Sequence, residues 1–220
     1  MQLTEEFIQK ETHRADCYRL LSACYCKPGK EFIEEGLVKN LITALEPICN
    51  NAVPFAKDMD NALSKYTNTE ILVDYSALFI GPFGLLAPPY GSVYLEGKRT
   101  VMGDTTIDAV KYYRKAGVEM DPAQKDMPDH ISVELEFMYY LINKGLEAYQ
   151  NSDNEGFLNY HNMQEDFLRR HIGVWMPKFA KDLREGAKNP FYKNLADCTL
   201  TFIKSDMEYM MIKRGEKGMA

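Results

Sequence analysis

Residues 5–26 read EEFIQKETHRADCYRLLSACYC, and this stretch decides the fold class. Large side chains recur every three or four positions along it, which is the spacing of one face of an α-helix. Pro28-Gly29 follows directly and is a strong signal for the end of a helix. The pattern predicts a helix over residues 5–26 whose inward face carries Phe7, Glu11, Arg14, Tyr18, Leu21 and Tyr25.

The same helical spacing continues along most of the chain. Thr67 and Glu70 have capping-box spacing, Asp104 or Thr105 is a plausible cap further on, and Gly117 is placed to end that helix. Clean period-two alternation and internal repeats are both absent from the sequence. We therefore expect an all-α protein of about nine helices, over roughly residues 5–26, 32–45, 55–66, 67–79, 105–116, 128–149, 153–171, 176–185 and 190–212.

Two segments interrupt the helical pattern. Residues 81–91, GPFGLLAPPYG, contain three prolines and three glycines and cannot form a regular helix. They carry no charge, so we expect this loop to pack on the helices beneath it. Residues 119–127 are polar and resemble a linker. We expect one helical domain over residues 1–220 with a possible hinge at 119–127, so the protein would be a monomer or a domain-swapped dimer.

The amino-acid composition narrows the class of protein to which this chain can belong. The 220 residues are 45% hydrophobic and 26% charged, which is ordinary for a globular domain, and the net charge is -6. This balance argues against nucleic acid and suits a cationic partner. Residues 1–16 do not form a signal peptide, and no apolar stretch is long enough to span a membrane. Five cysteines, an odd number, indicate free thiols in the reducing cytoplasm.

Motifs for metals, nucleotides and nucleophilic catalysis fail on spacing. Cys24 and Cys26 form a single pair where structural zinc needs four ligands, and no histidine has the Glu-x-x-His spacing of di-iron bundles. Residues 91–100, GSVYLEGKRT, miss the phosphate-loop spacing, and no Gly-x-Ser-x-Gly elbow occurs. We therefore expect no cofactor, no metal and no enzyme activity. The alternative is an α-helical enzyme or cofactor carrier that uses His130 with Asp129 or Glu134.

Four segments, residues 75–83, 88–94, 102–106 and 128–131, remain as candidates for a binding surface. Aromatic and leucine side chains at helical spacing in the first are typical of a core face. Asp129 is typical of a helix cap. His130 follows at the expected first helical position, where the positive helix end disfavours its protonation.

Together and in this order, the four segments resemble the TorD/DmsD family of redox enzyme maturation proteins. The resemblance includes Tyr-x-x-Leu-Phe-x-Gly at 75–81, Pro-Pro-Tyr-Gly-Ser-Val-Tyr at 88–94, Gly-Asp-Thr-Thr at 103–106 and Pro-Asp-His-Ile at 128–131. It covers roughly residues 5–205, and the Pro-Asp-His-Ile motif is its most specific part. Such proteins are cytoplasmic chaperones of molybdoenzymes that the twin-arginine pathway exports.

The resemblance implies a TorD-like helical fold and a surface that binds a twin-arginine leader or the apo form of a molybdoenzyme subunit until its cofactor is inserted. A leader of this kind is basic and then apolar, which suits an acidic protein with an aromatic groove. Contact with the membrane translocon would be transient at most. The identity of the client reductase stays open. The residues that match the family's leader-binding surface are Tyr75, Leu78, Phe79, Phe83, Pro88, Pro89, Tyr90, Gly103, Asp129 and His130.

Overall fold

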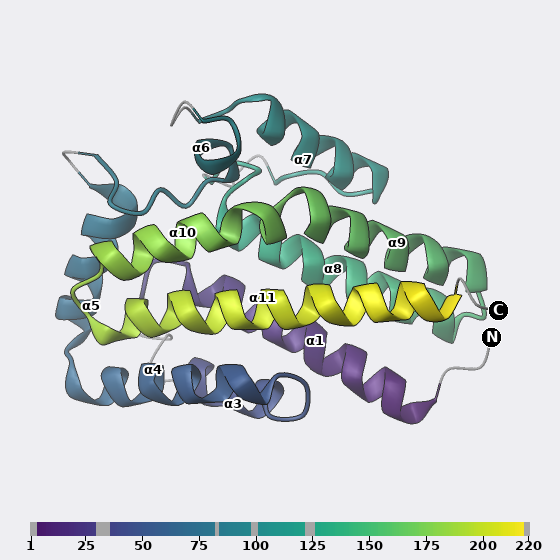
Figure 1. Cartoon of the computed structure of the whole chain (residues 1–220), viewed down its shortest axis with the longest axis horizontal. Helices are drawn as coiled ribbons and strands as arrows, with labels where there is room; N and C mark the ends of the chain where they lie inside the picture. The colour runs from purple at the N-terminus through teal and green to yellow at the C-terminus, as the bar shows by residue number, and fades with distance from the viewer. Residues whose placement is uncertain (1–3, 30–35, 82–83, 98–100, 122–125, 218–220) are drawn as a thin grey trace.

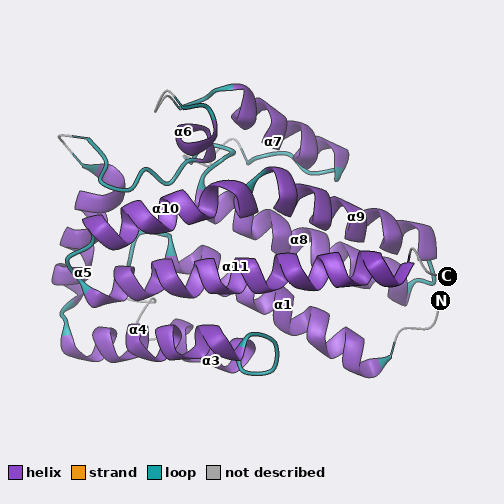
Figure 2. Ribbon diagram, viewed as in Figure 1, coloured by secondary structure: helices purple, strands orange, loops and turns teal. Residues whose placement is uncertain are grey.

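A computed structural model describes residues 4–29, 36–81, 84–97, 101–121 and 126–217, with side chains placed up to residue 211 (Figures 1 and 2). Within these ranges the chain is helical, and the single β-type pairing is an isolated bridge between Tyr90 and His130. The all-α prediction is confirmed. The α-helices are α1 (Glu5–Cys24), α3 (Leu37–Leu45), α4 (Val53–Lys65), α5 (Asn68–Tyr75), α6 (Gly91–Leu95), α7 (Asp104–Lys115), α8 (Ile131–Gln150), α9 (Asn154–Arg170), α10 (Ile172–Gly186) and α11 (Pro190–Lys217).

The long helix α11 runs along the centre of the molecule, with α10 on one side and α4 on the other (Figure 1). Helix α1 packs mainly on α8 and α3, and α8 packs on α9. Helices α6 and α7 lie at the opposite edge from α3 and α4 in Figure 1. The largest fully buried side chains include Trp175, Tyr18, Tyr25 and Phe202, so the core is strongly aromatic. None of the described helices is long and apolar enough to cross a membrane.

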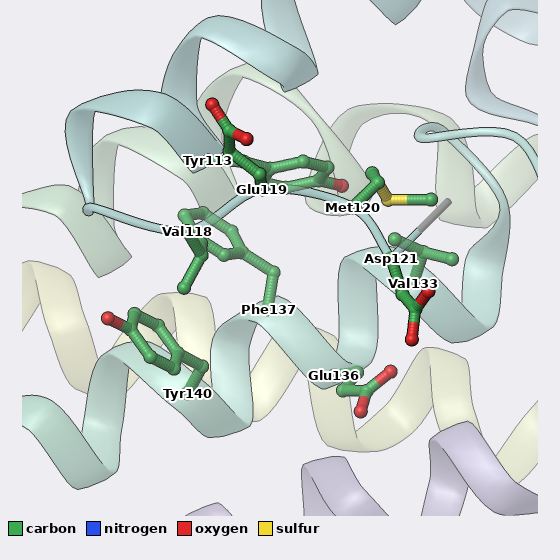
Figure 3. A pocket seen from close by; sticks show the side chains of 9 residues that line it. All are labelled: Tyr113, Val118, Glu119, Met120, Asp121, Val133, Glu136, Phe137 and Tyr140. Atoms are coloured by element: carbon green, nitrogen blue, oxygen red, sulfur yellow. The ribbon is translucent and has the colours of Figure 1, made fainter. Parts of the chain in front are cut away.

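An open pocket of about 430 Å³ lies between α8 and residues 118–121, which follow α7 (Figure 3). Residues 119–121 begin the predicted hinge, and residues 122–125 of that hinge lie outside the described part of the chain. The hinge therefore stays a prediction. The loop over residues 84–91 packs on the protein as expected, because Ala87, Pro88 and Pro89 are buried.

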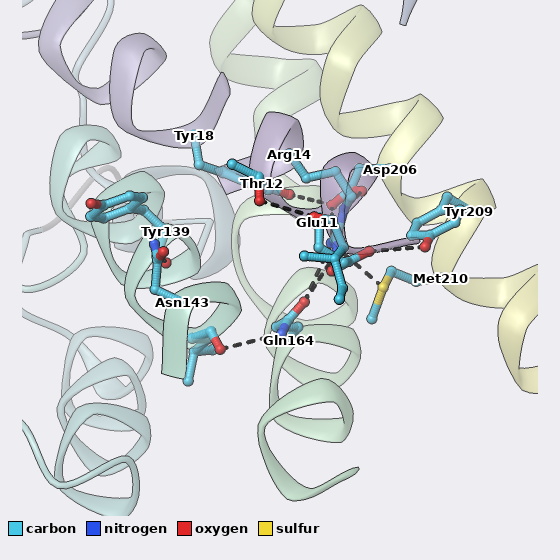
Figure 4. A network of polar contacts seen from close by, with 12 residues as sticks. Glu11, Thr12, Arg14, Tyr18, Tyr139, Asn143, Gln164, Asp206, Tyr209 and Met210 are labelled. Carbon is cyan, nitrogen blue, oxygen red and sulfur yellow. Dashed lines mark hydrogen bonds and ion pairs between the residues drawn. The ribbon is translucent and has the colours of Figure 1, made fainter. Parts of the chain in front are cut away.

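A buried polar network joins α1, α9 and α11 (Figure 4). The Arg14 guanidinium donates to both carboxylate oxygens of Asp206 at 2.6 and 3.0 Å and to Gln164 Oε1 at 3.4 Å, and it also pairs with Glu11. Tyr18 donates its hydroxyl to Asp206 Oδ2 at 2.6 Å. The inward face of α1 therefore includes charged residues that find their partners on α11 and α9.

The predicted start of α8 and the predicted cap of α7 were both wrong. Helix α8 begins at Ile131, with His130 as its N-cap, and not at Pro128-Asp129. Helix α7 has Gly103 as its N-cap residue, and the carboxylate of Glu96 accepts from the Thr105 N–H at 2.8 Å. The cap of α8 is thus the residue directly before the helix, whereas at α7 the contact comes from Glu96, nine positions before Thr105.

Candidate functional site

The structure brings two of the four predicted segments into direct contact. The Gly91 N–H donates to the Asp129 carbonyl at 2.8 Å, and the Ile131 N–H donates to the Pro89 carbonyl at 2.8 Å. Between these bonds Tyr90 pairs with His130 as the isolated bridge. We call residues 88–92 and 128–131 the junction. It joins two motifs that are about 40 positions apart in the sequence, so their shared surface is a product of the fold.

Asp129 fastens the junction from within. Its Oδ2 accepts from the Ser92 N–H at 2.8 Å, at the second residue of α6, and its side chain is 1% exposed. This carboxylate therefore caps α6 and not α8, the helix that Asp129 was expected to cap. Asp129 Oδ1 and Ser92 Oγ are also buried, and neither has a hydrogen-bond partner among the described residues. Because Asp129 is shielded from solvent, its role in this conformation is to maintain the shape of the junction.

His130 belongs to the junction and directly precedes α8. Its Nδ1 accepts from the Ser132 N–H at 3.2 Å and lies 2.7 Å from Ser132 Oγ, so the ring caps the helix. The ring also meets Tyr90 edge-on, with the two centroids 5.4 Å apart. Burial lowers the pKa of His130, opposed by the charges of Asp126 and Asp129. A pKa below its ordinary value leaves the ring neutral near pH 7, and burial is the main cause.

Behind the junction lies a second buried polar group, Glu134. Its Oε2 accepts from the Trp175 indole N–H at 2.9 Å, and its Oε1 lies 3.7 Å from His171 Nδ1. Burial raises the pKa of Glu134 well above its ordinary value, and the Trp175 bond opposes this only in part. The site also depends on Gly91, because a Cβ there would lie 3.0 Å from Trp175 Nε1.

The predicted residues of the first segment are buried next to this surface. Burial, followed by the charges of Cys26, Asp126 and Tyr90, raises the pKa of Tyr75 to about 12. Tyr75, Leu78 and Phe79 are buried at 8%, 0% and 6% exposure. The Phe79 ring packs against Tyr75, Tyr192 and Tyr25 with centroid distances of 5.1, 5.8 and 6.3 Å. In this conformation these three side chains belong to the aromatic core, and their direct contact with a peptide stays a prediction. Phe83 lies outside the described residues.

Gly103 is half-buried and has a packing role. A Cβ at this position would collide with the Glu96 carboxylate, which is held by the Thr105 backbone and hydroxyl. Contact of Gly103 with a partner stays a prediction. Sequence reasoning did not assign roles to Ser92, Glu96 or Trp175 in this site. The single tryptophan of the chain was the one available signal among them.

Acidic and aromatic groups surround the outer face of the junction. Tyr90 is half-buried, and Cys26, Asp126 and Glu136 are exposed. Burial, followed by the charges of Asp126 and Asp129, raises the pKa of Tyr90. Burial, followed by the charges of Asp126 and Glu136, raises the pKa of the Cys26 thiol. Asp126 acts on both Tyr90 and Cys26, and Glu136 acts on Cys26. The four side chains therefore lie around one region, to which Asp126 and Glu136 contribute negative charge.

The alternative enzyme or cofactor-carrier reading gains no support from this arrangement. Asp129 and Glu134 are each engaged in structural hydrogen bonds, and the His130 Nδ1 is used as a helix cap. Across the described residues, His, Cys, Asp and Glu side chains do not gather in any group of three or more that would hold a metal ion.

Comparison with known proteins identifies the family. The family model described as nitrate reductase delta subunit matches residues 41–181, well over half of the chain, and the chain belongs to this family. A structure from Archaeoglobus fulgidus that is named for redox enzyme maturation has a TM-score of 0.56 and 21% identity, and the match covers 93% of this chain and 96% of that one. This likeness supports the fold.

Several curated relatives are named as chaperones. The chaperone protein TorD of Vibrio parahaemolyticus is 29% identical over 144 residues, which cover 64% of this chain and 65% of TorD. The perchlorate reductase assembly chaperone protein of Dechloromonas aromatica is 26% identical over 215 residues, or 94% of each chain. The Tat proofreading chaperone DmsD of Salmonella typhi is 29% identical over 121 residues, which cover 55% of this chain and 52% of DmsD.

These matches confirm the resemblance to TorD and DmsD. The match spans about two thirds of the TorD relative and half of the DmsD relative, and nearly all of the perchlorate reductase chaperone. The three relatives are named for chaperoning and assembly and not for a catalysed reaction, which agrees with the expectation that this chain is not an enzyme.

Proposed function

We propose that this protein is a cytoplasmic chaperone that binds the twin-arginine leader or the apo form of a molybdenum-containing oxidoreductase subunit and holds it until the cofactor is inserted, before export. The observation that carries the proposal is membership of a family whose relatives are named for Tat proofreading and for reductase assembly. Because the function is binding and release, it requires no catalytic group.

The outer face of the junction is the proposed leader-binding surface. Tyr90 and Gly103 are half-buried, so part of each is accessible. Asp126 supplies negative charge near Tyr90, and Asp126 and Glu136 supply it near Cys26. A leader that is basic and then apolar complements such a surface in both charge and polarity. Asp129 and His130 hold the surface from beneath through the hydrogen bonds to Ser92 and Ser132.

Asp129→Asn tests how the buried carboxylate contributes. An amide oxygen in its place still accepts from the Ser92 N–H, so the junction should keep its shape. We expect leader affinity to change by less than about 0.5 kcal/mol, because surface contacts away from the substitution are preserved. If affinity instead falls by about 1–3 kcal/mol with no loss of stability, Asp129 pairs directly with a leader cation.

Capture of client subunits from a defined mixture tests the function itself. The immobilised protein is offered purified apo catalytic subunits of dimethyl sulfoxide, trimethylamine oxide and tetrathionate reductases, each with and without its leader. We expect one subunit to be retained, more strongly when its leader is present. Retention of none of the three in either form, repeated with the leader peptides alone, would contradict the proposal.

A further inference from the structure

The pocket between α8 and residues 118–121 is separate from the residues that the motifs identified. Figure 3 shows residues 118–121 on one side of it and the α8 side chains on the other. Its lining is apolar at the base and acidic at the mouth. The lining residues are Tyr113, Val118, Glu119, Met120, Asp121, Val133, Glu136, Phe137 and Tyr140.

The base of the pocket is built from fixed side chains. Tyr113, Val133 and Phe137 are buried, and the Tyr113 and Phe137 rings meet edge-on at 4.6 Å between centroids. The Tyr113 hydroxyl donates to the Pro128 carbonyl at 2.6 Å, and the Tyr140 hydroxyl donates to the Ala116 carbonyl at 3.1 Å. These bonds hold the aromatic walls in place, so the pocket is formed before any partner arrives.

Among the described residues, the charges around the mouth are all negative. Glu119, Asp121 and Glu136 are exposed, and the described residues that line the pocket include no lysine, arginine or histidine. An apolar pocket of about 430 Å³ is large enough for one or two bulky apolar side chains. Negative charge on its mouth favours a segment that also carries cations.

The pocket adjoins the junction. Tyr113 lines the pocket and hydrogen-bonds the residue that precedes Asp129, while Val133 is one helical turn beyond His130. Glu136 belongs to the pocket mouth, and its charge also acts on Cys26 beside the junction. A single extended peptide could therefore lie on both.

We propose that this pocket takes apolar side chains of the leader, while Glu119 and Glu136 at its mouth attract the leader's arginine side chains. The proposal rests on the proposed leader-binding function and adds a second, previously unassigned contact surface. Its occupant is a peptide segment in which bulky apolar residues follow basic ones.

Charge reversal at the mouth tests the proposal. A fluorescent twin-arginine leader peptide is titrated with the wild type, Glu136→Lys, Glu119→Lys and the control Glu46→Lys, which makes the same charge change at an exposed position after α3. We expect Glu136→Lys to weaken binding about tenfold or more and Glu46→Lys to change it less than about twofold. Melting curves check that every variant is folded.

A second peptide identifies the interacting charges. When glutamine replaces both arginines of the leader, the difference between Glu136→Lys and Glu46→Lys should shrink to within about twofold, because the paired charge is gone. Val118→Trp, which fills part of the pocket, should weaken both peptides about equally. These results together support the pocket as the leader's apolar contact.

Other outcomes overturn the proposal and separate it from the function. If the wild type binds the leader but Glu136→Lys and Glu119→Lys match Glu46→Lys, the leader lies elsewhere and the chaperone function stands. If the wild type binds no leader but retains an apo subunit in the capture assay, the pocket assignment is wrong and the chaperone function stands. If it binds neither, both are wrong. If Glu136→Lys alters the oligomeric state of the protein without peptide, the pocket is covered by a second copy of this chain instead.

Discussion

Phe79 and Tyr90 were both expected at the binding surface, and their surroundings differ. Phe79 is 6% exposed inside the aromatic core, whereas Tyr90 is half-buried and meets only the edge of His130 among the described ring contacts. We expect Phe79→Ala to lower the free energy of unfolding by about 3–5 kcal/mol, as for other large-to-small core changes. Tyr90→Ala should cost less stability and weaken leader binding by about 2 kcal/mol if the ring is an anchor.

Urea unfolding and leader titration on the same two variants separate these roles. The titration is carried out at a temperature where Phe79→Ala remains folded, so that a lost fold is not mistaken for a lost contact. A Phe79→Ala protein of wild-type stability but weakened affinity would place Phe79 at the surface and contradict the described packing.

Glu134 predicts a specific pH dependence of stability. Burial raises its pKa in the folded protein, while the unfolded chain titrates at about 4.3. Above that pH the folded state keeps a proton that the unfolded state has lost, so this residue makes stability fall as pH rises towards the folded pKa. Glu134→Gln removes the titration and retains an oxygen that accepts from the Trp175 indole.

The measurement is the free energy of unfolding of both proteins at several pH values from 5 to 8. The advantage of Glu134→Gln over the wild type should grow with pH, by up to about 1.4 kcal/mol per pH unit within the window. His130 titrates in both proteins. His171 Nδ1 lies 3.7 Å from Glu134 Oε1, so the difference reports Glu134 together with its effect on His171. Parallel stability curves would mean that the Glu134 pKa is not raised.

At the level of single residues, the sequence predicted which residues form the junction better than it predicted what each residue does there. Asp129 has the residue type and position of an N-cap, which local rules assign to α8. Its carboxylate instead accepts from Ser92, which is 37 positions earlier in the chain. Local pattern does not contain this information, because the partner is brought close by the packing of α6 against α10 and α7.

Among the helical elements, α1, α9 and α11 depend on the buried charges around Arg14. Removing one partner of a buried ion pair leaves the other charge without compensation, which typically costs about 3–5 kcal/mol. We expect Arg14→Met to have a cost of this size, because Asp206 and Glu11 then lack their cation. Urea unfolding of the purified variant measures it.

A double variant and a surface control sharpen this result. Arg14→Met combined with Asp206→Leu should cost less than the sum of the two single changes, because the second removes the stranded carboxylate. Arg19→Ala breaks an exposed ion pair with Asp16 on the same helix and should have little effect. Additive single costs would show that Arg14 and Asp206 do not act as a pair.

Helix boundaries were predicted correctly where the signal is local and wrongly where distant packing decides them. The capping box at Thr67 and Glu70 is present, because all of its groups lie within one turn. The start of α10 was predicted at about residue 176, but the helix begins at Ile172 and contains Pro177. Burial of Trp175 and its bond to Glu134 outweigh the one backbone hydrogen bond that proline cannot make.

For the whole molecule, the fold class followed from the sequence because helical spacing is repeated in nearly every segment. The candidate site followed only in part, since motif order identified the junction but not the pocket. Glu119 follows α7, Val133 and Phe137 lie on α8, and none of the three belongs to a motif. Their common position depends on how α7 and residues 118–121 pack against α8, which sequence spacing does not encode.

The central claim is that this protein binds a twin-arginine leader through a negatively charged, partly apolar surface. Calorimetric titration of the full chain with a leader peptide at two salt concentrations tests it most directly. We predict saturable binding of one peptide per chain, a negative heat-capacity change from apolar burial, and weaker binding at higher salt. Absence of binding, or equal binding of a peptide with its arginines and apolar residues scrambled, would contradict the claim.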